Sequence, residues 1–219
     1  MPRRDKRTDA SRERMIETAE RLFAEHGLYT VPLRQIGAEA GASNKVAVQY
    51  HFGDRAGLIQ AIFEKRLAEF EARRAALLAA AEAAGQADEP RVLMDIIFRP
   101  LAEQRDSSGR RSYAAFLLAL QLNEADYRLR AQADPMAPIT RRVMELLAAR
   151  APHVPRALLF ERSLAASVMI LSGIVRRDHR DKPPAPDDVL IDDALDAATA
   201  AVTAPVSPGV LAAMEAPRG

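Results

Sequence analysis

Apolar residues recur along this chain at the three- and four-residue spacing of amphipathic α-helices, and no stretch shows the two-residue alternation of a half-buried strand. Gly and Pro residues separate the helical stretches, notably Gly27, Gly41, Gly85 and the prolines at 152 and 155. The spacing predicts helices over about residues 9–26, 33–40, 44–51, 54–84, 91–104, 110–123, 125–133, 139–150, 156–179 and 187–202. We therefore expect an all-α protein.

The stretch from Pro32 to Arg55, PLRQIGAEAGASNKVAVQYHFGDR, predicts two short helices joined by a glycine-containing turn. Two helices joined in this way form the unit that places its second helix in the major groove of DNA. Ala47 and Val48 would anchor the second helix, which leaves Lys45, Val46, Gln49 and Tyr50 facing outward. The preceding helix, whose polar positions including Glu20 are expected outside, would complete a three-helix head.

This organisation divides the chain into four parts. We expect a flexible basic arm over residues 1–8, a helix-turn-helix DNA-binding domain over 9–55, a helical regulatory and dimerisation domain over 56–203, and a flexible tail over 204–219. The arm, in which basic residues outnumber acidic ones, can reach phosphates or a minor groove. The tail has room for one marginal turn around residues 210–214. The helix over 156–179 mixes small and large apolar residues, and we expect it to be the most buried.

The composition and the absence of known catalytic motifs limit the functions that this chain can have. The net charge is only +1, so a basic field over the whole protein does not argue for nucleic acid, and the absence of cysteine excludes thiolate chemistry. The four histidines lie far apart, and the sequence has no GxSxG motif, phosphate loop or dinucleotide fingerprint. An acidic cluster in the last predicted helix is more typical of helix N-terminal charge than of a cation site (Asp187, Asp188, Asp192, Asp193, Asp196). We predict no enzymatic activity, no cofactor and no metal site.

Two further observations concern membranes. The first residues, MPRRDKRTDASRER, lack the apolar run of a signal peptide. The longest nearly continuous apolar run, Leu164 to Val175, is too short to span a bilayer. We expect a cytoplasmic protein that does not contact a membrane.

Three ordered strings, ETAERLFAEHG, LRQIGAEAG and AVQYHFGDRAGL, resemble the tetracycline-repressor (TetR) family of bacterial regulators. The resemblance covers about the first quarter of the chain, and beyond it only the layout of helices is similar. It implies that Lys45, Val46 and Gln49 read bases, because lysine can bind guanine acceptors, glutamine can pair with adenine, and valine can touch a thymine methyl group.

The resemblance also implies phosphate contacts from Asn44, Tyr50, His51 and Arg55. For Tyr50 a core position, and for His51 a local hydrogen bond, remain alternatives. Thr30 would partly replace the hydroxyl group that the family usually has where this chain has Val31. The turn is one residue longer than the family's commonest form, which leaves the register of the second helix open by one residue.

For the body, the resemblance implies a pocket for a small, largely apolar effector. The residues on apolar faces that could surround it are Met94, Phe98, Tyr113, Phe116, Leu117, Leu120, Met144, Met169 and Ser172, with Arg105, Gln121 and Asn123 as polar candidates. The alternative is that these side chains are ordinary core.

The function that we expect is a homodimeric repressor that binds double-stranded DNA at a palindromic operator and is released by the effector. Its two-fold interface would use the helices over about 156–179 and 187–202, because one short helix reads too few base pairs alone. Two alternatives remain: a helix-turn-helix regulator that responds to a protein partner or acts as an activator, and a helical carrier or enzyme that does not bind DNA.

Overall fold

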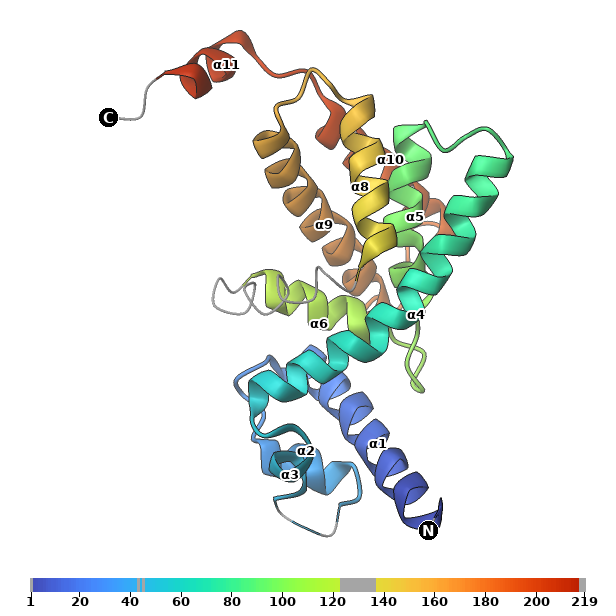
Figure 1. Cartoon of the computed structure of the whole chain (residues 1–219), viewed down its shortest axis with the longest axis vertical. Coiled ribbons are helices and arrows are strands. Elements are labelled where there is room, and N and C mark those ends of the chain that lie inside the picture. The colour runs from blue at the N-terminus through green and yellow to red at the C-terminus, as the bar shows by residue number, and fades with distance from the viewer. Residues whose placement is uncertain (1, 43, 45, 123–136, 217–219) are drawn as a thin grey trace.

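The computed structural model describes residues 2–42, 44, 46–122 and 137–216, and within these ranges every regular element is an α-helix, which confirms the all-α fold (Figure 1). The helices are α1 (Pro2–His26), α2 (Leu33–Glu39), α3 (Ala47–Phe52), α4 (Arg55–Ala83), α5 (Pro90–Glu103), α6 (Ser112–Gln121), α8 (Pro138–Arg150), α9 (Arg156–Asp178), α10 (Asp187–Thr203) and α11 (Pro208–Glu215).

The first three helices and the start of α4 form a head at one end of the molecule, and α4 runs from this head into the body (Figure 1). Helix α1 packs on α2 and α4, and α2 packs on α3. The apolar side chains that the helical spacing predicts to point inward fill the centre of the head: Ile16, Phe23, Ile36, Val48, Leu58 and Ile62. This core holds α2 and α3 at a fixed angle to the long helix.

The body packs α5 between α4, α8 and α10, and α9 against α10 and α6. Helix α6 lies between the body and the head, where it contacts α1 (Figure 1). Phe116 of α6 is fully buried and stacks on Phe23 of α1, with 6.4 Å between ring centroids, while Phe63 of α4 lies 5.6 Å away. Head and body therefore share one apolar core.

Two predictions for the first helix are wrong. Helix α1 begins at Pro2, so residues 2–8 belong to a helix and not to a flexible arm. Proline suits the first turn of a helix, and no glycine or further proline interrupts the sequence before Gly27. Glu20, which the spacing placed outside, is 1% exposed because α4 and α6 cover its face of α1.

The helix predicted over residues 44–51 is α3, which begins three residues later, at Ala47. Asn44 explains the shift, because its Oδ1 accepts a hydrogen bond from the backbone N–H of Val46 at 3.0 Å. A side chain that binds the backbone two residues ahead stabilises a turn in place of the first helical residues.

The C-terminal helix is longer than the single turn predicted around residues 210–214. The tail contains α11, a two-turn helix that begins at Pro208 after Ser207 and has no buried residue. It projects away from the body (Figure 1). The short helix predicted over residues 125–133 lies outside the described residues.

The sequence predicts that α9 is the most buried helix, yet α9 exposes one whole side. Ile170, Leu171 and Ile174 face α6 and α10, whereas Leu164, Ala165 and Val168 lie on the exposed or half-buried side. Among the described residues, α9 is long and apolar enough to span a bilayer by length and composition, and α10 with α11 passes the same test only as a pair bent by 53°. Helix α9 packs one side against α6 and α10 and leaves its other side, which is also apolar, exposed.

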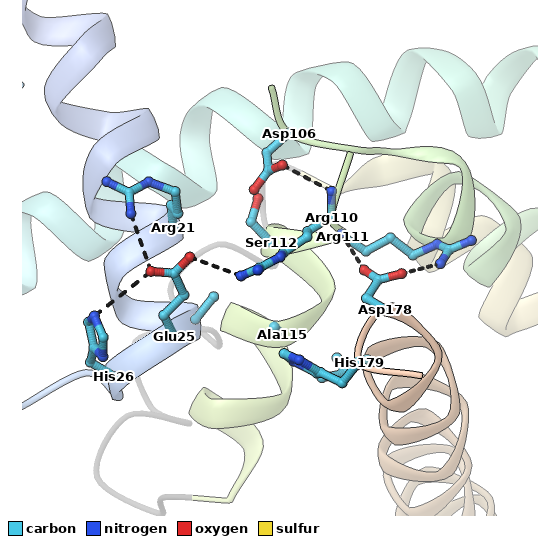
Figure 2. A pocket seen from close by; sticks show the side chains of 12 residues that line it. Arg21, Glu25, His26, Asp106, Arg110, Arg111, Ser112, Ala115, Asp178 and His179 are labelled. Atoms are coloured by element: carbon cyan, nitrogen blue, oxygen red, sulfur yellow. Dashed lines mark hydrogen bonds and ion pairs between the residues drawn. The ribbon is translucent and has the colours of Figure 1, made fainter. Parts of the chain in front are cut away.

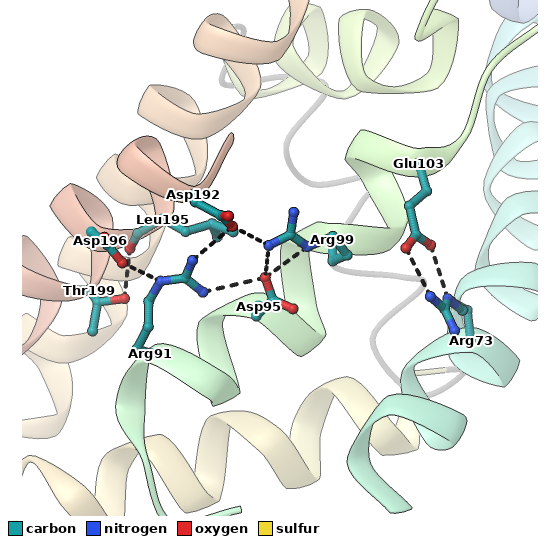
Figure 3. Close-up of polar contacts among 9 residues, drawn as sticks. All are labelled: Arg73, Arg91, Asp95, Arg99, Glu103, Asp192, Leu195, Asp196 and Thr199. Atoms are coloured by element: carbon teal, nitrogen blue, oxygen red, sulfur yellow. Dashed lines mark hydrogen bonds and ion pairs between the residues drawn. The ribbon is translucent and has the colours of Figure 1, made fainter. Parts of the chain in front are cut away.

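Arginines of α5 form ion pairs with two of the five residues of the acidic cluster on α10. Arg91 donates to Asp192 at 3.1 Å and also binds Asp196, while Arg99 joins Asp192 to Asp95 of its own helix (Figure 3). The hydrogen bond from Arg99 lowers the pKa of Asp192. These carboxylates are thus partners in an interhelical ion-pair network, and the described residues contain no group of acidic, His or Cys side chains that could hold a metal ion.

Candidate nucleic-acid interface

The connection between α3 and α4 fixes the orientation of the short helix. Asp54 caps α4, since its Oδ1 accepts from the backbone N–H of Gly57 at 2.9 Å. A Cβ atom at Gly57 would lie 2.0 Å from the carbonyl oxygen of Phe52, so the close approach of the end of α3 to α4 requires glycine there. Gly53 adopts a φ of +76°, which glycine tolerates without strain.

Helix α1 braces the pair from the other side. Arg14 Nε donates to the carbonyl oxygen of Ala40 at 3.4 Å, and Arg12 lies over the ring of Phe52, 5.3 Å from its centroid. Arg21 binds Glu39 of α2 at 2.8 Å. These contacts hold the end of α2 and the end of α3 to one rigid helix.

The outer side of α3 presents the side chains that the sequence placed there. Val46 and Gln49 are exposed, and Tyr50 is 80% exposed, whereas Val48 is buried against the head. An exposed Gln and Val on a helix that protrudes from the head can approach base edges in a major groove. Lys45 lies outside the described residues. Base contacts by these residues stay a prediction.

The structure gives local roles to three of the predicted phosphate contacts. Asn44 is exposed and uses its oxygen in the turn before α3. Thr30 is exposed and donates its hydroxyl proton to the carbonyl oxygen of His26 at 2.5 Å. His51 is half-buried and meets the ring of Tyr50 edge-on, with 5.2 Å between centroids. The exposure of Tyr50 excludes a core position for its ring.

Arg55, for which a phosphate contact is predicted, is half-buried at the start of α4. Its Nη2 donates to the carbonyl oxygen of Val31 at 2.7 Å, its Nη1 donates to that of Leu28, and its guanidinium lies over the rings of Phe23 and Tyr29. Carbonyl oxygens of the loop before α2 therefore engage two of the N–H donors of the Arg55 guanidinium. The structure assigns Arg55 to holding this loop against α4.

None of the nine residues predicted to surround an apolar pocket lines the cavity described below, and their role as a pocket stays a prediction. Six of them fill the core of the body: Met94, Phe98, Tyr113, Phe116, Leu117 and Leu120. Met144 and Ser172 are half-buried, and Met169, at 40% exposure, lies near the outer side of α9. Of the polar candidates, Arg105 binds Asp187 at 3.0 Å, Gln121 donates to Ser167 at 2.6 Å, and Asn123 lies outside the described residues.

A cavity of about 490 Å³ lies instead where the head meets the body (Figure 2). The end of α1, the loop between α5 and α6, the start of α6 and the end of α9 surround it. Its lining is largely charged: Arg21, Glu25, His26, Asp106, Arg110, Arg111, Asp178 and His179. Sequence reasoning missed this site because its residues come from four separate segments without a common motif.

Comparison with known proteins adds one finding to this geometry. The family described as bacterial regulatory proteins, tetR family, matches residues 15–62, a range that includes all of α2 and α3 and ends in the second turn of α4. No curated protein matches the chain.

Proposed function

Because the chain belongs, through its N-terminal domain, to the tetR family of bacterial regulatory proteins, we propose that it is a cytoplasmic repressor that binds a palindromic operator as a homodimer. The observation that carries this proposal is the outer side of α3, where Val46, Gln49 and Tyr50 are exposed on a helix held firmly by α1, α2 and α4. Such a side can enter a major groove without any rearrangement of the head.

The exposed side of α9 supports the homodimer. Leu164, Ala165 and Val168 lie along this side. The exposed side chains of Phe160 and Met169 flank them. Small and apolar residues on the outside of a long helix suit close packing against an identical helix, as in an isologous two-fold interface. Helix α10, packed beside α9, adds the exposed Ala197, Ala200 and Ala201.

Release by a small molecule completes the proposed mechanism. The long helix α4 joins the head to the body, so a ligand that favours another pose of α4 changes the spacing of the two heads in the dimer. A ligand shifts the population only by its difference in affinity for the two poses, and about 5.5 kcal/mol moves an equilibrium from 1:99 to 99:1. If the DNA-bound pose is only moderately favoured, a smaller difference in ligand affinity is enough to release the repressor from most operators.

Selection from a random-sequence DNA library tests the DNA-binding function and identifies the operator in the same experiment. We expect the purified protein to enrich a palindromic sequence and to bind it with an affinity that falls steeply with salt concentration. A protein that enriches no sequence at any salt concentration is not a sequence-specific regulator. Enrichment of a single, non-palindromic half-site contradicts the two-fold arrangement.

Sedimentation of two matched variants tests the interface. Ala165→Glu places a charge on the exposed side of α9, and Ala72→Glu makes the same change at an exposed position of α4. Both helices tolerate glutamate, so neither monomer should lose stability. We expect Ala165→Glu to sediment as a monomer and Ala72→Glu as a dimer; two dimeric variants would place the interface elsewhere.

A further inference from the structure

The charged cavity at the junction of head and body has arginine, histidine, aspartate and glutamate side chains in its lining (Figure 2). Its volume of about 490 Å³ lies within the range of small-molecule sites, roughly 300–1,000 Å³. One wall belongs to α1, in the head, and the others belong to the body. A molecule bound there would contact both units at once.

Two of the three carboxylates that line the cavity are built into its wall. Asp178 accepts from the backbone N–H of Arg111 at 2.6 Å and from its Nη1 at 2.5 Å. Asp106 accepts through Oδ1 from Ser108 and from the backbone N–H of Arg110, and its Oδ2 is buried without a hydrogen-bond partner. Arg111 itself is 2% exposed and also donates to the carbonyl oxygen of Ala102. These groups have fixed internal roles.

Three of the remaining side chains, Arg21, His26 and Arg110, converge on one carboxylate. Glu25 Oε2 lies 3.2 Å from Arg21 Nη1 and 3.8 Å from His26 Nε2, and Glu25 Oε1 lies 3.2 Å from Arg110 Nη1 (Figure 2). The Arg110 side chain is 51% exposed and that of Glu25 is 28% exposed, so this bridge between α1 and the body is open to solvent. Exposed ion pairs of this kind contribute little stability and are readily exchanged.

We propose that this cavity binds a small organic anion through a carboxylate that takes the place of Glu25 beside Arg21 and Arg110. The proposal rests on the proposed function, since it names the effector class of the same regulator. The incoming carboxylate accepts hydrogen bonds from the two guanidinium groups, which present planar donors suited to carboxylates. Glu25 then leaves Arg110, and α1 loses its exposed ion pair with the loop between α5 and α6.

The geometry favours an anion over a cation. A cationic ligand would have to compete with Arg111 for Asp178, and with backbone N–H groups for Asp106, at buried or half-buried positions. An anion meets two arginines whose shared partner in the cavity is a single, movable glutamate. The effector is thus polar, in contrast to the largely apolar molecule expected from the sequence.

Calorimetric titration with succinate tests the site directly, with sodium chloride of equal ionic strength as the blank and inorganic phosphate as a second anion. We compare the wild-type protein with Arg110→Gln, Glu25→Gln and the control Arg142→Gln, whose ion pair with Glu82 lies on the exposed surface between α8 and α4. Loss of one charge-assisted hydrogen bond should weaken succinate binding about tenfold in Arg110→Gln. Glu25→Gln removes the competing carboxylate and should tighten it several-fold, and Arg142→Gln should not change it.

Succinate affinity should fall in Arg110→Gln and rise in Glu25→Gln. These opposite changes distinguish binding at a defined site from general anion binding. Equal affinity in all four proteins, or an equal heat from the chloride blank, would overturn the proposal. Phosphate binding that depends on Arg110 without succinate binding would overturn the carboxylate class. Succinate binding that follows the predicted order but leaves the selected DNA bound would support the site and contradict its role as the effector site. Failure of DNA selection itself would count against the proposed function alone.

Discussion

Replacing Glu20 by glutamine removes one charge from a buried polar cluster that links α1, α4 and α6. The Glu20 carboxylate, 1% exposed on α1, accepts from Arg66 Nε of α4 at 2.6 Å and from Arg66 Nη2 at 3.1 Å. It also accepts from the hydroxyl of Ser112, the first residue of α6, at 2.6 Å. Burial alone would lower the pKa of Arg66, but the hydrogen bond and charge of Glu20, with those of Glu69, raise it above its ordinary value.

The expected magnitude follows from burial. Removing one partner of a buried ion pair typically costs about 3–5 kcal/mol. We expect the lower end, about 3 kcal/mol, because glutamine keeps the shape of glutamate and Arg66 keeps its 2.9 Å bond to Glu69. For a chain of this length that loss lowers the melting temperature by about 6–12 °C.

The assay compares the free energies of unfolding of Glu20→Gln and Glu103→Gln, measured by denaturant unfolding. Glu103 also binds an arginine, Arg73, in a two-bond pair at 2.8 and 2.9 Å, but that pair is exposed (Figure 3). Its loss should cost less than about 1 kcal/mol. Equal losses in the two variants would refute the reasoning, because burial would then not decide the energy of these pairs.

Three further predictions concern the head and the ion pairs. Gln49→Ala should weaken binding by about 1–3 kcal/mol at one operator position only, measured on single-base variants of the selected site, and an equal loss on every sequence would argue against base reading. Arg55→Ala should lower the free energy of unfolding by about 2 kcal/mol and leave the salt dependence of DNA binding unchanged, whereas a slope reduced by about one unit would show a phosphate contact. The pKa of Asp192 is lowered by its bond to Arg99, so this pair stabilises the fold above the unfolded-state value of about 3.9 and the stabilisation is lost as pH falls through the lowered pKa. Asp192→Asn should therefore lose less stability than the wild type between about pH 5 and pH 2, and parallel acid-unfolding curves would contradict the assignment.

The helices could be predicted from the sequence where apolar spacing and the positions of Gly and Pro determine them. The apolar spacing identified the buried faces of α1 and α4, and Gly85 and Pro90 marked the end of α4 and the start of α5. The outward side of α3 followed from the same reasoning, since Val48 is buried and Gln49 is exposed. Periodicity suffices here because each residue's environment depends on its own helix.

Long-range polar contacts could not be predicted in this way. Arg55 binds backbone carbonyls 24 and 27 residues earlier, and carbonyl groups leave no trace in a sequence. Glu20 occupies a position that is polar by helical spacing, yet it is buried because its partners on α4 and α6 lie 46 and 92 residues away. The cavity likewise depends on how α6 and α9 cross α1, which apolar patterning within single helices does not determine.

Hydroxyl-radical footprinting of the selected operator tests most directly whether the outward side of α3 reads DNA from a two-fold pair of subunits. We predict two protected patches on the same face of the duplex, centred about one helical turn or a multiple of it apart, roughly 10 base pairs. Gln49→Ala should weaken both patches equally. A single patch, or a footprint that does not depend on Gln49, would contradict this account.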